Sequence, residues 1–137
     1  MTYALGECLQ VAVYGRLSGD AELNTLISGA VFDAVPETTP DLFVALGAER
    51  AVGRSDATAG GAVHDFQVSV VTRRDGYLAA KAAAARVSDL LVGADIPLTR
   101  GRLISLRFLR ADARRDKTAG TRRIDLRFRA RLDDQGQ

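Results

Sequence analysis

The sequence has 137 residues, of which 47% are apolar and 26% are charged, and its formal net charge is +2. This length and composition suit one soluble domain, and the longest apolar stretches fall short of the roughly 20 residues that span a bilayer. The N-terminal residues lack a basic segment ahead of an apolar run, and Cys8 is the only cysteine. We therefore expect no signal peptide, no membrane contact and no intrachain disulfide, with synthesis in the cytoplasm.

Two helices are predicted at the start of the chain. Residues 3–17 carry apolar side chains at positions 5, 9, 12, 13 and 17, a spacing that fits a helix with one buried stripe. Asp20 suits the N-cap of a second helix, and Gly29 suits its end.

Strands are predicted next. A short strand over 31–33 and a longer one over 42–52 flank a turn-rich stretch that contains Pro36 and Pro40. The polar, glycine-rich residues 53–61 are expected to form a flexible loop between two long strands.

A strand and a long helix follow. In residues 62–73, apolar positions alternate with polar ones, which favours a strand with one buried face. Asp75 is expected to cap a helix over 76–92, whose stripe of small residues would let it lie close to a sheet.

The chain is expected to end in a hairpin. Its strands are predicted over 102–111 and 122–132, and the charged residues 112–121 are expected to form a mobile tip. The first strand is expected to present an apolar face made by Ile104, Leu106 and Phe108. The second strand alternates apolar residues with the charged series Arg123, Asp125, Arg127, Arg129 and Arg131.

This order of elements predicts an α+β fold. We expect an antiparallel sheet of about four to five strands with helices packed on one face, two of them N-terminal and one long and central. One domain over residues 1–137 is expected.

No pattern in the sequence indicates catalysis. His64 is the only histidine, and it shares a strand face with Phe66, so a structural role is favoured over a catalytic one. One histidine and one distant cysteine do not make a zinc site, and no phosphate-binding glycine loop is present. We expect no enzyme, no cofactor, no metal and no small-molecule substrate.

The C-terminal hairpin is strongly basic. Residues 100–131 carry twelve basic and three acidic groups, whereas residues 1–99 carry seven basic and twelve acidic ones. One interpretation is a surface for DNA phosphates or an acidic protein; the other is a solvated face whose arginines pair with acids of the same sheet. No aromatic residue shares the basic face, which disfavours binding of single-stranded nucleic acid. The candidate interface residues are Arg54, Ser55, Asp56, Arg114, Arg115, Lys117, Arg123, Arg127, Arg129 and Arg131.

Four segments together resemble a known family. They are YALGECLQVAVYGRLSGDAEL at 3–23, VFDAVPETTPDLFVALG at 31–47, residues 54–91, and RGRLISLRFLRADARRDKTAGTRRIDLRFRARLDD at 100–134. The chain resembles the tail-terminator, or tail-completion, proteins of long flexible-tailed phages and of the gene transfer agents of alphaproteobacteria.

The resemblance implies an assembly part of a virion. Such proteins are made in the bacterial cytoplasm and incorporated into the particle at the head–tail junction. Six copies form a ring that caps the tail tube, stops its polymerisation and meets a neck or stopper protein, and DNA passes through the ring without sequence-specific contacts. The unequal charges at the two ends of the chain suit head-to-tail contacts between copies. The alternatives are another head–tail connector or stopper protein and a small basic nucleic-acid-binding module.

Overall fold

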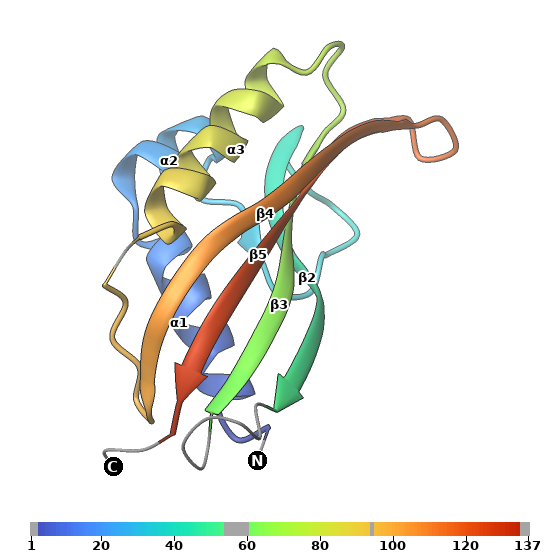
Figure 1. Cartoon of the computed structure of the whole chain (residues 1–137). Coiled ribbons are helices and arrows are strands. Elements are labelled where there is room, and N and C mark those ends of the chain that lie inside the picture. Colours follow the sequence, from blue (N-terminus) through green and yellow to red (C-terminus); the bar gives the residue numbers. More distant parts are fainter. Residues whose placement is uncertain (1–2, 54–60, 94, 135–137) are drawn as a thin grey trace.

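The computed structural model describes residues 3–53, 61–93 and 95–134. Within these ranges the elements follow one another as three helices and five strands (Figure 1). In chain order they are α1 (Gly6–Ser18), α2 (Ala21–Ile27), β1 (Val31–Phe32), β2 (Leu42–Gly53), β3 (Gly61–Thr72), α3 (Leu78–Leu91), β4 (Arg102–Asp116) and β5 (Thr121–Asp133). In the described part of the chain, no helix is long and apolar enough to cross a membrane.

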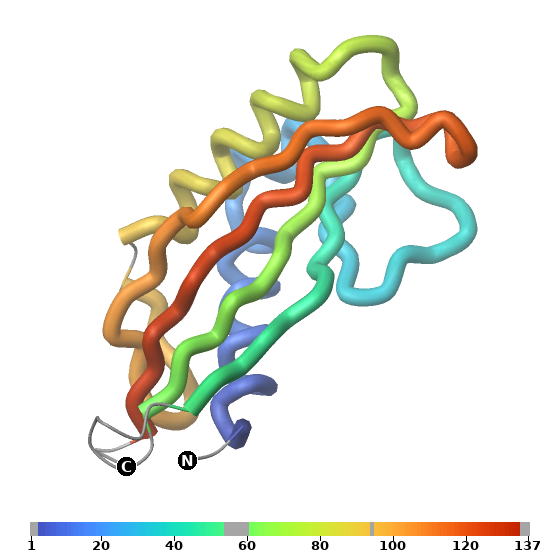
Figure 2. The backbone as a smooth tube through the Cα atoms, turned by 45° about the vertical axis from the view of Figure 1, so that its right-hand side comes forward, coloured from blue at the N-terminus to red at the C-terminus, as the bar shows by residue number. Residues whose placement is uncertain are grey.

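The five strands form one mixed sheet in the order β1-β2-β3-β5-β4. Only the short β1 is parallel to its neighbour, β2; the other described pairs are antiparallel. All three helices lie on one face of the sheet, and the opposite face carries none (Figures 1 and 2). The predicted α+β fold is therefore confirmed, with one parallel pair that the sequence did not indicate.

The main core lies between the helices and the sheet. Its centre is Phe128 of β5, which is fully buried, stacks on Phe66 at a centroid distance of 5.6 Å and meets Phe108 edge-on at 6.0 Å. Alternate residues of β3 and β5 point into this core, as their sequence pattern predicts. Above them, α3 buries Ala80 and Ala83 completely, and such small side chains let a helix lie close to a sheet.

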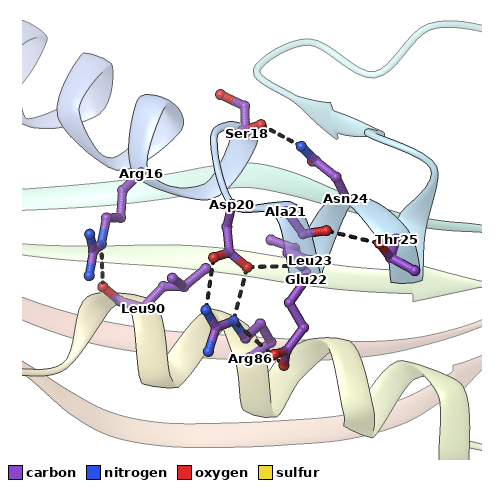
Figure 3. A network of polar contacts seen from close by, with 10 residues as sticks. All are labelled: Arg16, Ser18, Asp20, Ala21, Glu22, Leu23, Asn24, Thr25, Arg86 and Leu90. Atoms are coloured by element: carbon purple, nitrogen blue, oxygen red, sulfur yellow. Dashed lines mark hydrogen bonds and ion pairs between the residues drawn. The ribbon is translucent and has the colours of Figure 1, made fainter.

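Asp20 joins the start of α2 to α3. Its carboxylate accepts a hydrogen bond from the backbone N–H of Leu23 at 2.9 Å, which confirms it as the N-cap of α2 (Figure 3). The same carboxylate receives both arms of the Arg86 guanidinium of α3, at 2.8 and 2.9 Å. The Asp20 carboxylate, which the sequence predicts only as an N-cap, therefore also joins α2 to α3.

We expect Asp20→Asn to lower the free energy of unfolding at neutral pH. We also expect the free energy of unfolding of this variant to fall less between pH 3.8 and about 2 than that of the wild type. The Arg86 guanidinium, with help from the Leu23 N–H, lowers the pKa of Asp20 to about 2 from its ordinary value of 3.8. Because the folded-state pKa is depressed, this contribution is present above pH 3.8 and is lost as the pH falls towards about 2. Urea unfolding followed by circular dichroism across this range measures it. Equal losses in variant and wild type over this range would contradict the linkage.

Two predicted helix starts were wrong. α1 begins at Gly6 and not at residue 3, and α3 begins at Leu78 with Tyr77 as its N-cap, so Asp75 does not cap it. Gly76 adopts a φ of +82°, a left-handed conformation that separates Asp75 from the first helical turn. Asp75 instead lies 3.6 Å from Arg122 of β5.

The predicted mobile tip over 112–121 was also wrong. β4 continues to Asp116 and β5 begins at Thr121, so the turn contains only residues 117–120. Asp116 accepts a hydrogen bond from the N–H of Ala119 at 3.1 Å, and Gly120 takes a φ of +69°. The second half of β4 was not predicted as a strand because its residues are mostly charged. An edge strand tolerates charged side chains on both faces.

β4 does not present the continuous apolar face that its sequence predicts. Leu106 is buried, but Ile104 is 48% exposed and Phe108 is 43% exposed. The pairing of β4 with β5 shifts between Leu103 and Ser105 and again between Phe108 and Arg110. Each shift interrupts the alternation of side chains, and the strand lies at the edge of the sheet, where its far side has no neighbouring strand among the described residues.

Candidate functional site

We call the face of the sheet without helices the open face (Figure 2). The strand registers place its charged side chains on four strands: Arg50 of β2, Asp65 of β3, Arg107, Arg110, Asp112 and Arg114 of β4, and Arg123, Asp125, Arg127, Arg129 and Arg131 of β5. The row of arginines predicted on β5 is therefore part of a wider basic surface.

Some of these arginines are held by acids of the same sheet. Arg129 donates two hydrogen bonds to Asp65 at 2.7 and 2.9 Å. Arg123 donates to Asp125 at 3.0 Å, and Arg114 lies 3.5 Å from the same carboxylate. For these three arginines, the interpretation as a face paired within its own sheet is correct.

The carboxylates in these pairs are ionised at neutral pH. The hydrogen bonds from Arg129 hold the pKa of Asp65 below its usual value. Burial raises the pKa of Asp125, but hydrogen bonds from Ser69 and Arg123 outweigh burial, and the net shift is downward. In this part of the open face three arginines, Arg114, Arg123 and Arg129, therefore share two ionised carboxylates, which hold the guanidinium groups in place.

At one end of the open face the arginines are not neutralised. A hollow of about 360 Å³ lies there between β2, β3, β5 and β4, and we call it the arginine hollow. It is lined by Arg50, Val52, Val63, Asp65, Arg107, Arg129 and Arg131. Within the described chain, Arg50, Arg107 and Arg131 have neither an ion pair nor a side-chain hydrogen bond. Among the described residues that line the hollow, four arginines therefore face one carboxylate, that of Asp65.

The β4 edge of the sheet is apolar as well as basic. Ile104, Phe108 and Leu109 are 48%, 43% and 37% exposed, and we call these three residues the β4 edge. Phe108 also lines an apolar groove of about 350 Å³ between α3 and the final hairpin, with Ala111 and Ala113 of β4 beside it. Exposed apolar side chains gathered along an edge strand are typical of an interaction surface.

A second exposed apolar surface lies beside β1, at the opposite edge of the sheet. Val11 and Tyr14 of α1 are 59% and 40% exposed, and Val35 is 51% exposed. Val11 and Tyr14 line a hollow of about 230 Å³ together with Gln10 and Asp33, which hydrogen bond to each other. We call Glu7, Val11, Tyr14, Asp33 and Val35 the α1 face.

The predicted interface residues divide into several groups. Arg54, Ser55 and Asp56 lie outside the described residues. Lys117 lies in the hairpin turn, and Arg115 lies across from Arg122, whose guanidinium is 5.8 Å from the centre of the Tyr77 ring on the helix side. Arg114 and Arg123 are the two that share Asp125. Arg129 and Arg131 line the arginine hollow, and Arg127 lies next to it on β5.

Sequence reasoning missed Arg50 and Arg107 of the hollow, and it missed the α1 face. The two arginines come from strands far apart in the chain, so only the register brings them beside Arg131. The signal that could have found the α1 face is the helical spacing of Glu7, Val11 and Tyr14, which places them on one side of α1.

His64 is held between a carboxylate and an aromatic ring, and its Nε2 has no hydrogen-bond partner among the described residues. It is fully buried, its Nδ1 lies 2.8 Å from Oε2 of Glu49, and the Tyr3 ring stacks on it at 5.8 Å. Glu49 also accepts a hydrogen bond from the Tyr3 hydroxyl, so one carboxylate holds both rings. A hollow that touches Glu49 has about 20 Å³, room for about one water molecule and none for a substrate.

Comparisons with known proteins point to one family. The family model described as tail completion protein gp17 matches residues 11–133. A solved structure described as the virion of a native gene transfer agent particle contains a chain with 54% sequence identity and a TM-score of 0.89. That match covers 96% of this chain and 99% of the other. No curated protein sequence matches the chain.

Proposed function

The chain belongs to the tail completion protein gp17 family, and from this premise we propose that it forms a hexameric ring that caps the tail tube and joins tail to head. The family resemblance predicted from the sequence is confirmed, and membership gives the chain a structural role in virion assembly. In the proposal, the ring stops addition of tube subunits, binds a neck or stopper protein, and leaves a passage for DNA.

The observation that carries the proposal is the likeness to a chain of an assembled particle. At 54% identity over 96% of this chain, the likeness covers the helices and the whole sheet and not only a shared core. We infer from it that this chain too is incorporated into a virion or phage-like particle, at the head–tail junction.

The two edges of the sheet support a ring. A closed ring needs two different surfaces on each copy, placed so that one meets the other on the next copy. The strand order puts β1 and β4 at opposite edges, with the α1 face beside one and the β4 edge along the other. In the proposed ring, the β4 edge of each copy packs against the α1 face of its neighbour.

The charges around these two surfaces are complementary. Glu7 and Asp33 belong to the α1 face, whereas β4 carries Arg107 without an ion pair among the described residues, and Arg110 and Arg114 beside Asp112 and Asp125. Complementary charges orient the encounter and fix its register, while the apolar side chains supply the buried contact. This arrangement supports the head-to-tail fit that the unequal charges of the sequence predict.

Deleting the gene in a bacterium that produces the particles tests the proposal. Electron microscopy is expected to show overlong tail tubes beside unjoined, DNA-filled heads, because nothing ends tube growth or bridges the two parts. Normal-length tails fixed to heads would contradict the proposed function. Free tails of normal length beside leaking heads would also contradict it and would favour a connector or stopper.

A further inference from the structure

The arginine hollow carries more positive charge than its own chain balances. Four guanidinium groups line it, and its one carboxylate, Asp65, is engaged by Arg129 through two hydrogen bonds. Within the described residues, Arg107 and Arg131 have no acidic partner, and Arg50 has none within ion-pair distance, although its charge helps to lower the pKa of Asp65. The three belong to β2, β4 and β5, so the sheet holds their backbones at fixed spacing around one concave space.

The strand pairing adds to this excess. Arg107 lies directly across from Arg129, and Arg110 lies directly across from Arg127. Like charges in directly opposed positions destabilise a sheet, so these pairs work against the fold of the isolated chain. Nearby acids offset part of that repulsion, because Asp65 is hydrogen bonded by Arg129 and Asp112 lies 3.2 Å from Arg110. Arg107 has no such acid among the described residues.

The lining of the hollow favours a polyanion over a protein partner. Protein interfaces are enriched in buried aromatic side chains at their centres. Among the described residues that line the hollow, none is aromatic, and the apolar ones are Val52 and Val63. Two exposed aromatic side chains, Tyr14 and Phe108, belong to the α1 face and the β4 edge, and a third, Tyr3, stacks on His64. Guanidinium forks match pairs of phosphate oxygens, and surfaces that bind DNA are polar and strongly basic.

We propose that the arginine hollow binds phosphate groups of duplex DNA through Arg50, Arg107 and Arg131. The choice of DNA among phosphate-bearing polyanions rests on the proposed function, because DNA is the polyanion that crosses the head–tail junction. The contact is with the backbone and carries no sequence preference. One chain offers few such contacts, so binding is weak at physiological salt, and the copies of a ring add theirs together.

Duplex binding by the purified full chain tests the proposal. Fluorescence anisotropy of a labelled duplex of arbitrary sequence is measured at low salt for wild type, Arg107→Gln, Arg131→Gln and the double variant. Arg115→Gln is the matched control, because it removes the same charge from an exposed arginine on the other face of the sheet. Circular dichroism verifies that each variant is folded.

The double variant is expected to lose roughly tenfold or more in duplex affinity, as for removal of charged hydrogen bonds. Its affinity should also depend less steeply on salt, by about one unit of slope per lost phosphate contact. Arg115→Gln is expected to change affinity less than about twofold, since it removes only a diffuse charge. Arg131→Lys is expected to fall between wild type and Arg131→Gln, because lysine keeps the charge but not the fork.

Several results would overturn the proposal. They are equal losses in Arg115→Gln and the double variant, an unchanged affinity in the double variant, and binding of inorganic phosphate but not duplex by wild type. A double variant that alters only the self-association seen by sedimentation would make the hollow a contact between copies. The proposed function is tested by a different experiment. A gene deletion that leaves tails and heads normal would contradict the head–tail role, but it would not affect the duplex affinities measured with the purified chain.

Discussion

Phe128→Ala is expected to lower the free energy of unfolding by about 3–5 kcal/mol, the usual cost of removing a buried aromatic ring. Phe128 is completely buried and contacts Phe66 and Phe108 through ring pairs, so alanine leaves a cavity at the centre of the sheet. Domains of this size are stable by about 5–15 kcal/mol, so the variant loses a large share of its stability. Urea unfolding followed by far-ultraviolet circular dichroism measures the loss.

A matched control separates this effect from the loss of any aromatic side chain. Tyr14 is 40% exposed, so Tyr14→Ala is expected to cost less than about 1 kcal/mol. If both variants unfolded at the same urea concentration, Phe128 would not be the centre of the core.

Phe108→Asp is expected to abolish joining of tails to heads. Because Phe108 also packs edge-on against the buried Phe128, circular dichroism of the purified variant separates this effect from a loss of the fold. Phe108 is the aromatic side chain of the β4 edge and lines the apolar groove beside α3, where the proposed ring buries it against the next copy. A carboxylate there would be desolvated without a partner, which interfaces do not tolerate. Complementation of the deletion strain with the variant gene, read by electron microscopy, measures the effect.

The control for this variant is Leu78→Asp. Leu78 is 86% exposed at the start of α3 and belongs to neither proposed contact surface, so normal particles are expected. Tyr14→Asp on the α1 face is expected to reproduce the Phe108→Asp defect, because in the proposed ring both side chains belong to the same contact. Normal particles from Phe108→Asp, or the same defect from Leu78→Asp, would contradict the proposed contact.

The start of a helix could be predicted from its capping residue only where no glycine turn intervened. Asp20 and Asp75 carry the same capping signal in the sequence, but only Asp20 caps a helix. The difference lies in Gly76, whose left-handed φ turns the chain before α3 begins. A glycine permits such a turn without requiring it, so the sequence alone does not decide the case.

Position in the sheet determined how well the strands could be predicted. β5 lies between two strands, and its alternation of apolar and charged residues holds along its length. β4 lies at the edge with two register shifts, so Ile104 and Phe108 are exposed where the sequence predicts burial. The alternation rule assumes regular pairing, which bulges break.

The arginine hollow could not be predicted from the sequence, because it depends on contacts between strands that are far apart in the chain. Arg123, Arg127, Arg129 and Arg131 look equivalent in the sequence, but Asp65 neutralises Arg129 whereas Arg131 lines the hollow without an acid of its own. Only the pairing of β3 with β5 separates these cases. The hairpin was predicted as a basic surface, and the division into paired and unpaired arginines followed from strand register.

The central claim is tested most directly by a cryo-electron microscopy reconstruction of the head–tail junction in intact particles. The account predicts a ring of six copies at the head-proximal end of the tube. In it, the β4 edge of each copy contacts the α1 face of the next, and the arginine hollow faces the DNA. A ring of twelve copies beside the portal, or a tube end without this chain, would contradict the account.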